Sequence, residues 1–316
     1  MHPKRNSPAL RVAGLGAVVG AAGLGYAAGI EVRNFVLRRV EIPCLPEGQR
    51  PLDVLHVSDL HMTPTQGRKQ RWLRSLADLQ PDLVVNTGDN LAHLRSVPVV
   101  LDALGPLLDL PGVFVFGSND YYAPTARNPL RYLGPDKGRR HTAAPRLPVE
   151  ELRSSFTGRG WVDLNNTTDR LEVGGSTLAF VGVDDPHLGL DDLSVVPGEA
   201  PYDADLRIGV AHAPYLRVLD QFARAGYDVT FAGHTHGGQL CLPVKGALVT
   251  NCDLETARAK GLHRHPADSR PVDPRSSWLH VSAGAGTSPF APVRFCCRPE
   301  ATLATLTPVR PRDILR

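Results

Sequence analysis

The sequence is short of the features that assign many proteins to a class. Its five cysteines include no Cys-x-x-Cys pair, which argues against a zinc-ribbon or thioredoxin-type motif, and their odd number argues against complete disulfide pairing. The net charge is only +3 and the basic residues are spread along the chain, so no nucleic-acid partner is expected. Internal repeats are not apparent, and 316 residues suit one large domain with a sizeable core. Composition leaves the oligomeric state open.

One stretch, residues 12–30, contains no charged residue and follows Lys4, Arg5 and Arg11. Its length suits a helix that spans a bilayer, but its many glycines and alanines also fit a cleaved signal peptide or a buried soluble helix. The preceding basic residues favour a cytoplasmic amino terminus and an extracytoplasmic domain, although three arginines soon after the stretch weaken this inference. We predict a single N-terminal membrane anchor, with an exported soluble form as the alternative.

We divide the chain into a membrane anchor or signal segment at 1–31, a linker at 32–49, a catalytic domain at 50–307 and a tail at 308–316. Within the domain, apolar runs typical of strands alternate with helical patterns, which predicts an α/β fold. The expected helices cover residues 67–80, 97–108, 148–159 and 214–225.

Five of the strand-like runs end in side chains that bind metals. These are Asp59 and His61 after 52–57, Asp89 and Asn90 after 82–86, Asn119 and Asp120 after 113–116, His212 after 206–211, and His234 and His236 after 227–232. The carboxyl ends of strands are where open α/β sheets place their sites. Oxygen and imidazole donors without thiolates suit Mn, Fe, Zn or Mg. The sequence therefore predicts a metal site at the carboxyl ends of these strands.

The order of these motifs resembles that of the calcineurin-like metallophosphoesterases. The matching blocks are Asp-x-His at 59–61, Gly-Asp-Asn at 88–90, Gly-x-x-Asp at 117–120, His212, and Gly-His-Thr-His at 233–236. The resemblance covers about residues 50–290 and implies a sandwich of two mixed β-sheets flanked by α-helices. The extended Gly-His-Thr-His-Gly-Gly-Gln form is similar to a membrane-associated bacterial branch of this family.

The resemblance also implies two divalent metal ions, Mn, Fe or Zn. Asp59, His61 and His236 would bind one ion, His212 and His234 would bind the other, and Asp89 would bridge them, while Asn90 and Asp120 would orient the ligands. Two such ions activate a hydroxide for in-line attack on phosphorus. We therefore expect hydrolysis of phosphoesters, in particular phosphodiester or pyrophosphate bonds.

The third block departs from the family pattern. Relatives usually carry Gly-Asn-His-Asp or Gly-Asn-His-Glu, whereas this chain carries Gly117-Ser118-Asn119-Asp120. An ungapped match places Ser118 at the ligand position and removes the histidine near the leaving group. In the alternative register, which we prefer, Asn119 reaches the metal, because an amide oxygen is a better ligand for a hard cation than a neutral hydroxyl.

Two functions stay open at this stage. The first is a phosphoester hydrolase at the membrane or cell envelope, with a lipid-linked phosphoester as a candidate substrate. The second is a metal-binding protein of the same fold with weak or lost catalysis, since a missing proton donor lowers a rate by about a hundred- to ten-thousandfold. Replacement donors would come from His93, His141 or His187.

Overall fold

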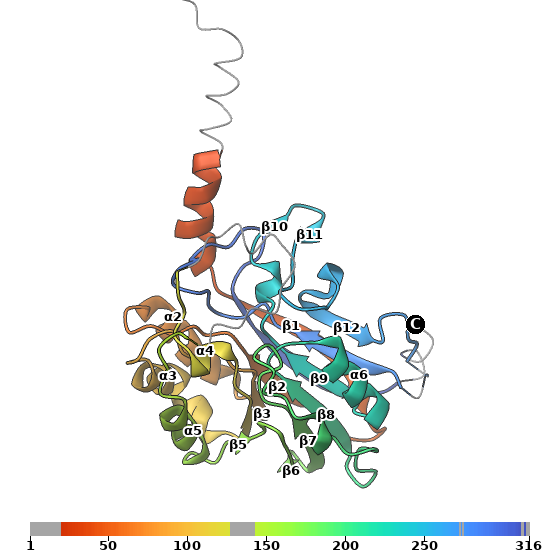
Figure 1. The fold of residues 1–316 in the computed structure, drawn as a ribbon. Helices are drawn as coiled ribbons and strands as arrows, with labels where there is room; N and C mark the ends of the chain where they lie inside the picture. The colour runs from red at the N-terminus through yellow and green to blue at the C-terminus, as the bar shows by residue number, and fades with distance from the viewer. Residues whose placement is uncertain (1–19, 127–142, 272, 274, 311–312, 314–316) are drawn as a thin grey trace, which may run out of the picture.

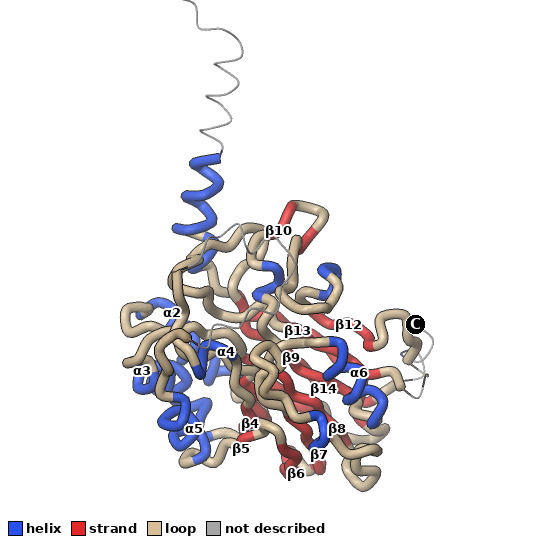
Figure 2. Tube along the Cα trace, in the orientation of Figure 1, coloured by secondary structure: helices blue, strands red, loops and turns tan. Residues whose placement is uncertain are grey.

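The computed structural model describes residues 20–126, 143–271, 273, 275–310 and 313. Two six-stranded mixed sheets form the centre of the molecule, and helices lie against their outer faces (Figures 1 and 2). This architecture confirms the predicted pair of mixed sheets flanked by helices.

The first sheet combines parallel central strands with an antiparallel neighbour. Its order is β1 (Val36–Leu45), β14 (Glu300–Pro308), β2 (Leu52–Val57), β3 (Leu83–Asn86), β4 (Gly112–Phe114) and β5 (Val162–Asp163). Strands β2 to β5 are parallel, and β14 is antiparallel to β2. The outer face carries α2 (Gly67–Ser75), α3 (Val97–Leu104) and α5 (Val149–Thr157).

The second sheet has four parallel strands between two antiparallel edges. Its order is β12 (Gly261–His265), β13 (Ser277–Val281), β9 (Val229–Ala232), β8 (Leu206–Ala211), β7 (Ser176–Gly182) and β6 (Thr167–Val173). Helix α6 (Leu216–Ala225) buries Val218 and Phe222 in a cluster with Val181 of β7 and Ala211 of β8. This helix ends at Gly226, whose φ of 91° suits a left-handed helix cap.

The remaining elements are shorter. They are α4 (Ser118–Tyr121), the hairpin β10 (Cys241–Leu242) with β11 (Gly246–Ala247), and the 3-10 helices η1 (Glu31–Arg33), η2 (Leu76–Leu79), η3 (Gly105–Asp109), η5 (Leu193–Val195), η6 (His236–Gly238) and η7 (Thr256–Arg258). Residues 20–29 form a further helix.

The main core lies between the sheets. Val54 and Val85 of the first sheet pack there with Ile208 and Phe231 of the second. Their chain neighbours, such as Leu55, point instead into the cluster beneath the helices. This alternation follows from the two-residue period of a strand and requires both faces of β2 and β3 to be apolar. The parallel strands thus carry their carboxyl-terminal loops to one edge.

The stretch predicted as a linker, residues 32–49, contains strand β1. Residues 36–45 pair in parallel with β14, at the edge of the first sheet. An edge strand buries few side chains, and Arg38 and Arg39 of β1 are exposed. The hydrophobic alternation that identifies a strand is therefore weak in this stretch.

Of the predicted membrane segment, only its second half belongs to the described structure. Residues 20–29 are helical, and residues 1–19 lie outside the described part. Across the described residues, every helix falls short of the length and apolar character needed to cross a membrane.

Candidate metal centre

Five of the predicted ligands share an unusual backbone conformation. The φ angles are 50° at Asp59, 41° at His61, 55° at Asp89, 68° at His234 and 49° at His236. Each such residue costs on the order of 1 kcal/mol, and strain of this kind is concentrated at functional sites. The strain turns these short side chains inward at the edge of the two sheets.

Glycines allow the strand ends to approach one another. A Cβ at Gly117 would collide with the Asp89 carboxylate and the His212 ring, and a Cβ at Gly233 would collide with Ser58 and Asp59. These two close approaches explain why the third block begins with glycine and why glycine precedes the His-Thr-His sequence.

Asp59, His61, Asp89 and His236 form one compact group. One ligand atom from each lies within 4.8 Å of all the others. The Nε2 atoms of His61 and His236 are 3.1 Å apart, His61 Nε2 is 3.3 Å from Asp89 Oδ2, and His236 Nε2 is 3.6 Å from Asp59 Oδ1. Two imidazoles and two carboxylates therefore face a single point.

A second pair of histidines lies on the other side of Asp89. His212 Nε2 is 3.6 Å from Asp89 Oδ1 and 3.3 Å from His234 Nδ1. The Asp89 carboxylate thus has one oxygen near His61 and the other near His212. The five other predicted ligands outside the third block, Asp59, His61, His212, His234 and His236, gather around it.

The outer nitrogens of three of these rings are held by backbone carbonyls. His212 Nδ1 is 2.7 Å from the oxygen of Thr87, His234 Nε2 is 3.2 Å from that of Asn251, and His236 Nδ1 is 3.1 Å from that of Gly286. A carbonyl oxygen accepts a hydrogen bond, so each outer nitrogen donates, and in a neutral ring the inner nitrogen then keeps its lone pair. This tautomer is the one that a metal-binding histidine requires.

The electrostatics of the group also fit a bound cation. Burial lowers the pKa of His61 to about 4 and that of His234 to about 3, so both rings are neutral ligands at pH 7. Although burial opposes it, the carboxylates of Asp89 and Asp59 raise the pKa of His212 to about 9. Without a metal, a proton on His212 supplies the positive charge that the two carboxylates attract, and a cation would replace it.

The third block places its two short polar residues in different surroundings. The backbone N–H of Asn119 donates to Asp89 Oδ1 at 2.7 Å, and its side-chain amide lies 2.8 Å from Asp89 Oδ2. The Ser118 hydroxyl donates instead to Asp185. Asn119 therefore belongs to the group around Asp89, and Ser118 does not contact that carboxylate.

Asp120 organises the backbone of the neighbouring turn. Its buried carboxylate accepts hydrogen bonds from the backbone N–H groups of Asp89, Asn90, Leu91 and Gly117, at 2.8 to 3.2 Å. Burial and the nearby Asp89 raise the pKa of Asp120 to about 7. The Asn90 side chain accepts a hydrogen bond from Asn86 at 2.8 Å, so it too supports the turn.

A chain of buried side chains reaches Asp59 from between the sheets, and the sequence did not predict it. His280 of β13 lies 2.9 Å from His56 of β2, and His56 lies 2.9 Å from the Thr87 hydroxyl. Thr87 donates to Ser58, which donates to Asp59 at 2.6 Å. Successive hydrogen bonds of this kind fix the orientation of the Asp59 carboxylate.

A second feature that the sequence did not predict is the position of Arg294. Its fully buried guanidinium donates to the carbonyls of Ala283, Gly284 and Gly286 at 2.7 to 3.1 Å, and one of its nitrogens lies 3.3 Å from His236 Nδ1. The arginine thus joins the loop after β13 to the His236 turn. A buried arginine among carbonyls has no local signature, because its partners lie on distant segments.

The three candidate proton donors have different positions. The His187 ring lies 4.7 Å from that of His234, between ring centres, and its Nδ1 is 3.1 Å from the Tyr215 hydroxyl. His93 is exposed and accepts a hydrogen bond from the backbone of Arg95. His141 lies outside the described residues.

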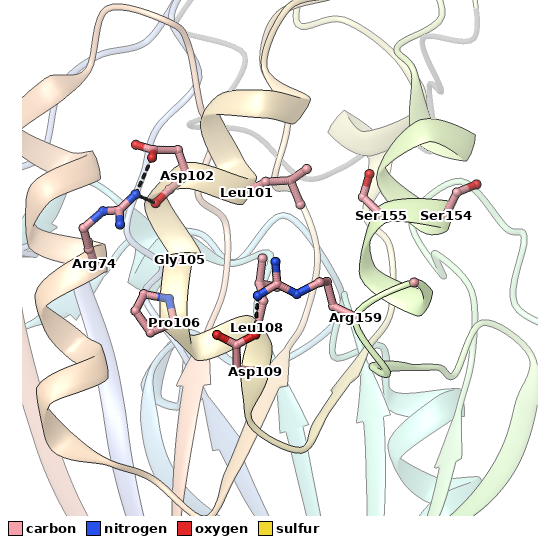
Figure 3. Close-up of a pocket in the computed structure, with 11 residues that line it drawn as sticks. Arg74, Leu101, Asp102, Gly105, Pro106, Leu108, Asp109, Ser154, Ser155 and Arg159 are labelled. Atoms are coloured by element: carbon pink, nitrogen blue, oxygen red, sulfur yellow. Dashed lines mark hydrogen bonds and ion pairs between the residues drawn. The ribbon is translucent and has the colours of Figure 1, made fainter.

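A surface hollow elsewhere is not part of this centre. It is lined by residues of the helical layer over the first sheet, including Arg74, Asp102, Asp109 and Arg159 (Figure 3). Both arginines already pair with the aspartates, Arg74 with Asp102 and Arg159 with Asp109. The hollow therefore offers no unpaired charge for a phosphate among these four side chains.

Comparison with known proteins agrees with the predicted resemblance. A sequence model named calcineurin-like phosphoesterase matches residues 52–238, which is more than half of the chain. An uncharacterised metallophosphoesterase of Bacillus subtilis, YkoQ, is 25% identical over 259 residues, covering 80% of this chain and 83% of its own.

Two further relatives carry more specific names. The UDP-2,3-diacylglucosamine pyrophosphatase LpxG of Chlamydia trachomatis is 27% identical over 293 residues, covering 80% of this chain and 82% of its own. A "transmembrane protein with metallophosphoesterase domain" from Danio rerio is 29% identical over 220 residues, covering 64% of this chain. This chain spans only 44% of the length of that fish protein.

Proposed function

The chain belongs to the calcineurin-like phosphoesterases, and on this basis we propose that it hydrolyses phosphodiester or pyrophosphate bonds with the help of two divalent metal ions. The observation that carries the proposal is the position of Asp89, with one carboxylate oxygen 3.3 Å from His61 Nε2 and the other 3.6 Å from His212 Nε2. A carboxylate with a histidine group on each side is the arrangement that a bridging ligand requires.

Each ion would have its own set of ligands. Asp59, His61 and His236 would hold the first with one oxygen of Asp89, and His212 and His234 would hold the second with the other oxygen. Asn119, whose side-chain nitrogen donates to Asp89 Oδ2 in this structure, would turn its amide to offer the oxygen to the second ion. When bound, two such cations activate water for attack on phosphorus and offset the charge on the attacking and leaving oxygens. The metal identity among Mn, Fe and Zn follows from availability, because the ligand set accepts all three.

The chain's own residues orient these ligands. Asp120 holds the turn that carries Asp89, and backbone carbonyls hold His212, His234 and His236 in the ligand tautomer. The imidazole that relatives have in the third block is absent, so an acidic leaving group, which departs without a proton, suits this site. Pyrophosphates and activated diesters have such leaving groups.

The name of one relative and the uncharged N-terminal stretch bear on the substrate class and the location. LpxG acts, by its name, on a nucleotide-linked acylated sugar, and residues 12–30 fit a membrane anchor. We therefore place the domain at the membrane, outside the cytoplasm, with a lipid-linked phosphoester as substrate.

The alternative function is metal binding without efficient catalysis. It is favoured by the Ser118-Asn119 sequence, which replaces two residues that relatives use in the third block. Under this alternative, two metals bind per chain but no ester is hydrolysed.

The deciding experiment measures hydrolysis of bis-p-nitrophenyl phosphate by the full chain after chelation and readdition of Mn. Asp89→Asn removes one charge from the bridge and is expected to lower the rate by about a thousandfold or more. Asp102→Asn, which makes the same chemical change at an exposed ion pair, is the matched control and should retain activity.

Turnover that requires both metal and Asp89 supports the hydrolase. Two bound metals per chain, with no turnover of this ester, of p-nitrophenyl phosphate or of a lipid-linked pyrophosphate, would instead favour the binding protein.

A further inference from the structure

Three segments without acidic residues meet at one end of the molecule. They are residues 20–30, 240–252 and 281–293, in which the only charged side chain is Lys245. The first contains the N-terminal helix, the second contains the β10–β11 hairpin, and the third begins at the last residue of β13 and forms the loop after it. Figure 1 shows the N-terminal helix and the hairpin projecting from the same end of the domain.

Direct contacts hold the three segments together. The backbone N–H of Arg294 donates to the Ala27 carbonyl at 3.1 Å, and the Tyr26 and Phe295 rings meet edge to face at 6.4 Å. Phe295 forms a parallel bridge with Leu240, immediately before β10. The Gln239 amide donates to the carbonyl of Ala291 at 2.8 Å. Helix, loop and hairpin are therefore in contact with one another.

This surface exposes large apolar side chains. The exposed fractions are 66% for Leu24, 59% for Ile30, 46% for Leu242 and 53% for Phe290, and Val244 is fully exposed. We call these five residues the apolar end. Large apolar side chains exposed at one end of a molecule point to a binding site for a protein or a membrane.

The hairpin tip has a second unusual feature. Val244 has a φ of 70°, a conformation that suits glycine or asparagine and is rare for a β-branched residue. Val244 is unfavourable in two respects, because its backbone conformation is strained and its apolar side chain is exposed to water. An apolar partner at this position would offset both costs.

We propose that the apolar end lies on the surface of a lipid bilayer, with the tip of the β10–β11 hairpin inserted at the boundary between headgroups and acyl chains. The uncharged N-terminal stretch leads into the same surface, so one partner would cover all three segments. Lys245 at the tip suits the anionic headgroups at that boundary.

This placement brings the bilayer next to the metal centre. The hairpin follows η6, which begins with His236, and the far side of the hairpin leads to Asn251, whose carbonyl holds His234. The delivery of a lipid-linked phosphoester to the metals in this way rests on the proposed function, whereas bilayer contact itself does not require catalysis.

The test places a tryptophan at the tip of the hairpin. Full-length Val244→Trp is incorporated into vesicles of phosphatidylglycerol and phosphatidylcholine whose acyl chains are brominated or unmodified. The matched control is Tyr202→Trp, which replaces a 94% exposed aromatic residue before the amino end of β8. Wild-type emission from the three native tryptophans is subtracted, and thermal unfolding checks that both variants are folded.

We expect the emission of the tryptophan introduced by Val244→Trp to shift to shorter wavelength when vesicles are added. In vesicles with brominated acyl chains, more than half of its intensity should be quenched. The emission of the tryptophan introduced by Tyr202→Trp should stay unchanged. If the hairpin tryptophan is unquenched in protein that floats with the vesicles, the proposal is overturned, and failure of the full chain to associate with the vesicles would overturn it too.

A blue shift that grows with protein concentration in the absence of lipid would show that a second copy covers this surface instead. The test measures fluorescence and not turnover, so its outcome does not depend on whether the protein is an active hydrolase.

Discussion

At the residue scale, the centre depends on short polar side chains whose orientation is set by their neighbours. Asp89 contacts both histidine groups, and Asn119 donates to Asp89 with its backbone. Ser118, one residue earlier, is turned toward Asp185. The distinction between these two residues decides how the altered third block works.

We predict that Asn119→Ala weakens binding of the second metal and lowers kcat/KM by roughly 10- to 100-fold, because the amide is the better ligand for a hard cation. Ser118→Ala should leave metal binding unchanged, since its hydroxyl bonds to Asp185. Metal titration and steady-state kinetics on bis-p-nitrophenyl phosphate measure both effects.

The opposite pattern would support the ungapped register. In that case Ser118→Ala loses metal, and Asn119→His raises activity on poor leaving groups by restoring an imidazole.

At the element scale, the two sheets are joined by a buried pair of histidines. His56 of β2 and His280 of β13 lie with their Nδ1 atoms 2.9 Å apart, and both side chains are almost fully buried. Burial lowers the pKa of His280 to about 4, and burial with the nearby His280 lowers the pKa of His56 well below its usual value. Both rings are therefore neutral in the folded protein at pH 7.

This pair should make the fold sensitive to acid. A histidine whose pKa is lowered by folding binds its proton more tightly in the unfolded chain, so stability falls as the pH drops below about 6.5. As the pH falls from 6.5 to 5, each ring should lower the free energy of unfolding by about 1–2 kcal/mol.

Urea unfolding of the wild type and of His280→Asn at several pH values measures this contribution. The variant is expected to be less stable at pH 7 but to lose less stability on acidification. An identical pH dependence in the two proteins would mean that the His280 ring does not contribute.

At the scale of the whole molecule, the N-terminal segment, the sandwich and the metal centre are physically connected. Glu31 accepts a hydrogen bond from the backbone of Cys297, and Cys297 in turn donates to the carbonyl of His236 at 3.2 Å. Strand β1 then continues the chain into the first sheet. The start of the domain therefore lies close to residue 31, before the position that the sequence indicated.

We expect a chain that lacks residues 1–29 to leave the membrane fraction after an alkaline carbonate wash and to retain turnover of bis-p-nitrophenyl phosphate. Glu31 is kept in this variant because it supports Cys297. If the truncated chain resists the wash as well as the full chain does, the N-terminal anchor is disproved.

Metal removal should destabilise the whole domain, because the ligands come from strand ends in both sheets. A ligand at 100 times its Kd stabilises the folded state by about 2.7 kcal/mol. For a domain of this size, chelation is expected to lower the Tm by about 5–10 °C, and Mn should restore it. Differential scanning calorimetry measures this shift. Asp89→Asn should show a smaller shift than the wild type.

The amino-acid sequence alone was enough to predict the α/β class and the identity of the side chains around Asp89, and its resemblance to a known family implied the paired mixed sheets. The first two features are local, because an apolar strand followed directly by Asp-x-His or His-Thr-His can be read without knowing its partners. Three others emerged only from the folded chain: the pairing of β1 with β14, the hydrogen-bond chain from His280 to Asp59, and the meeting of three segments at the apolar end. Each depends on contacts between segments far apart in the chain, which no local pattern records.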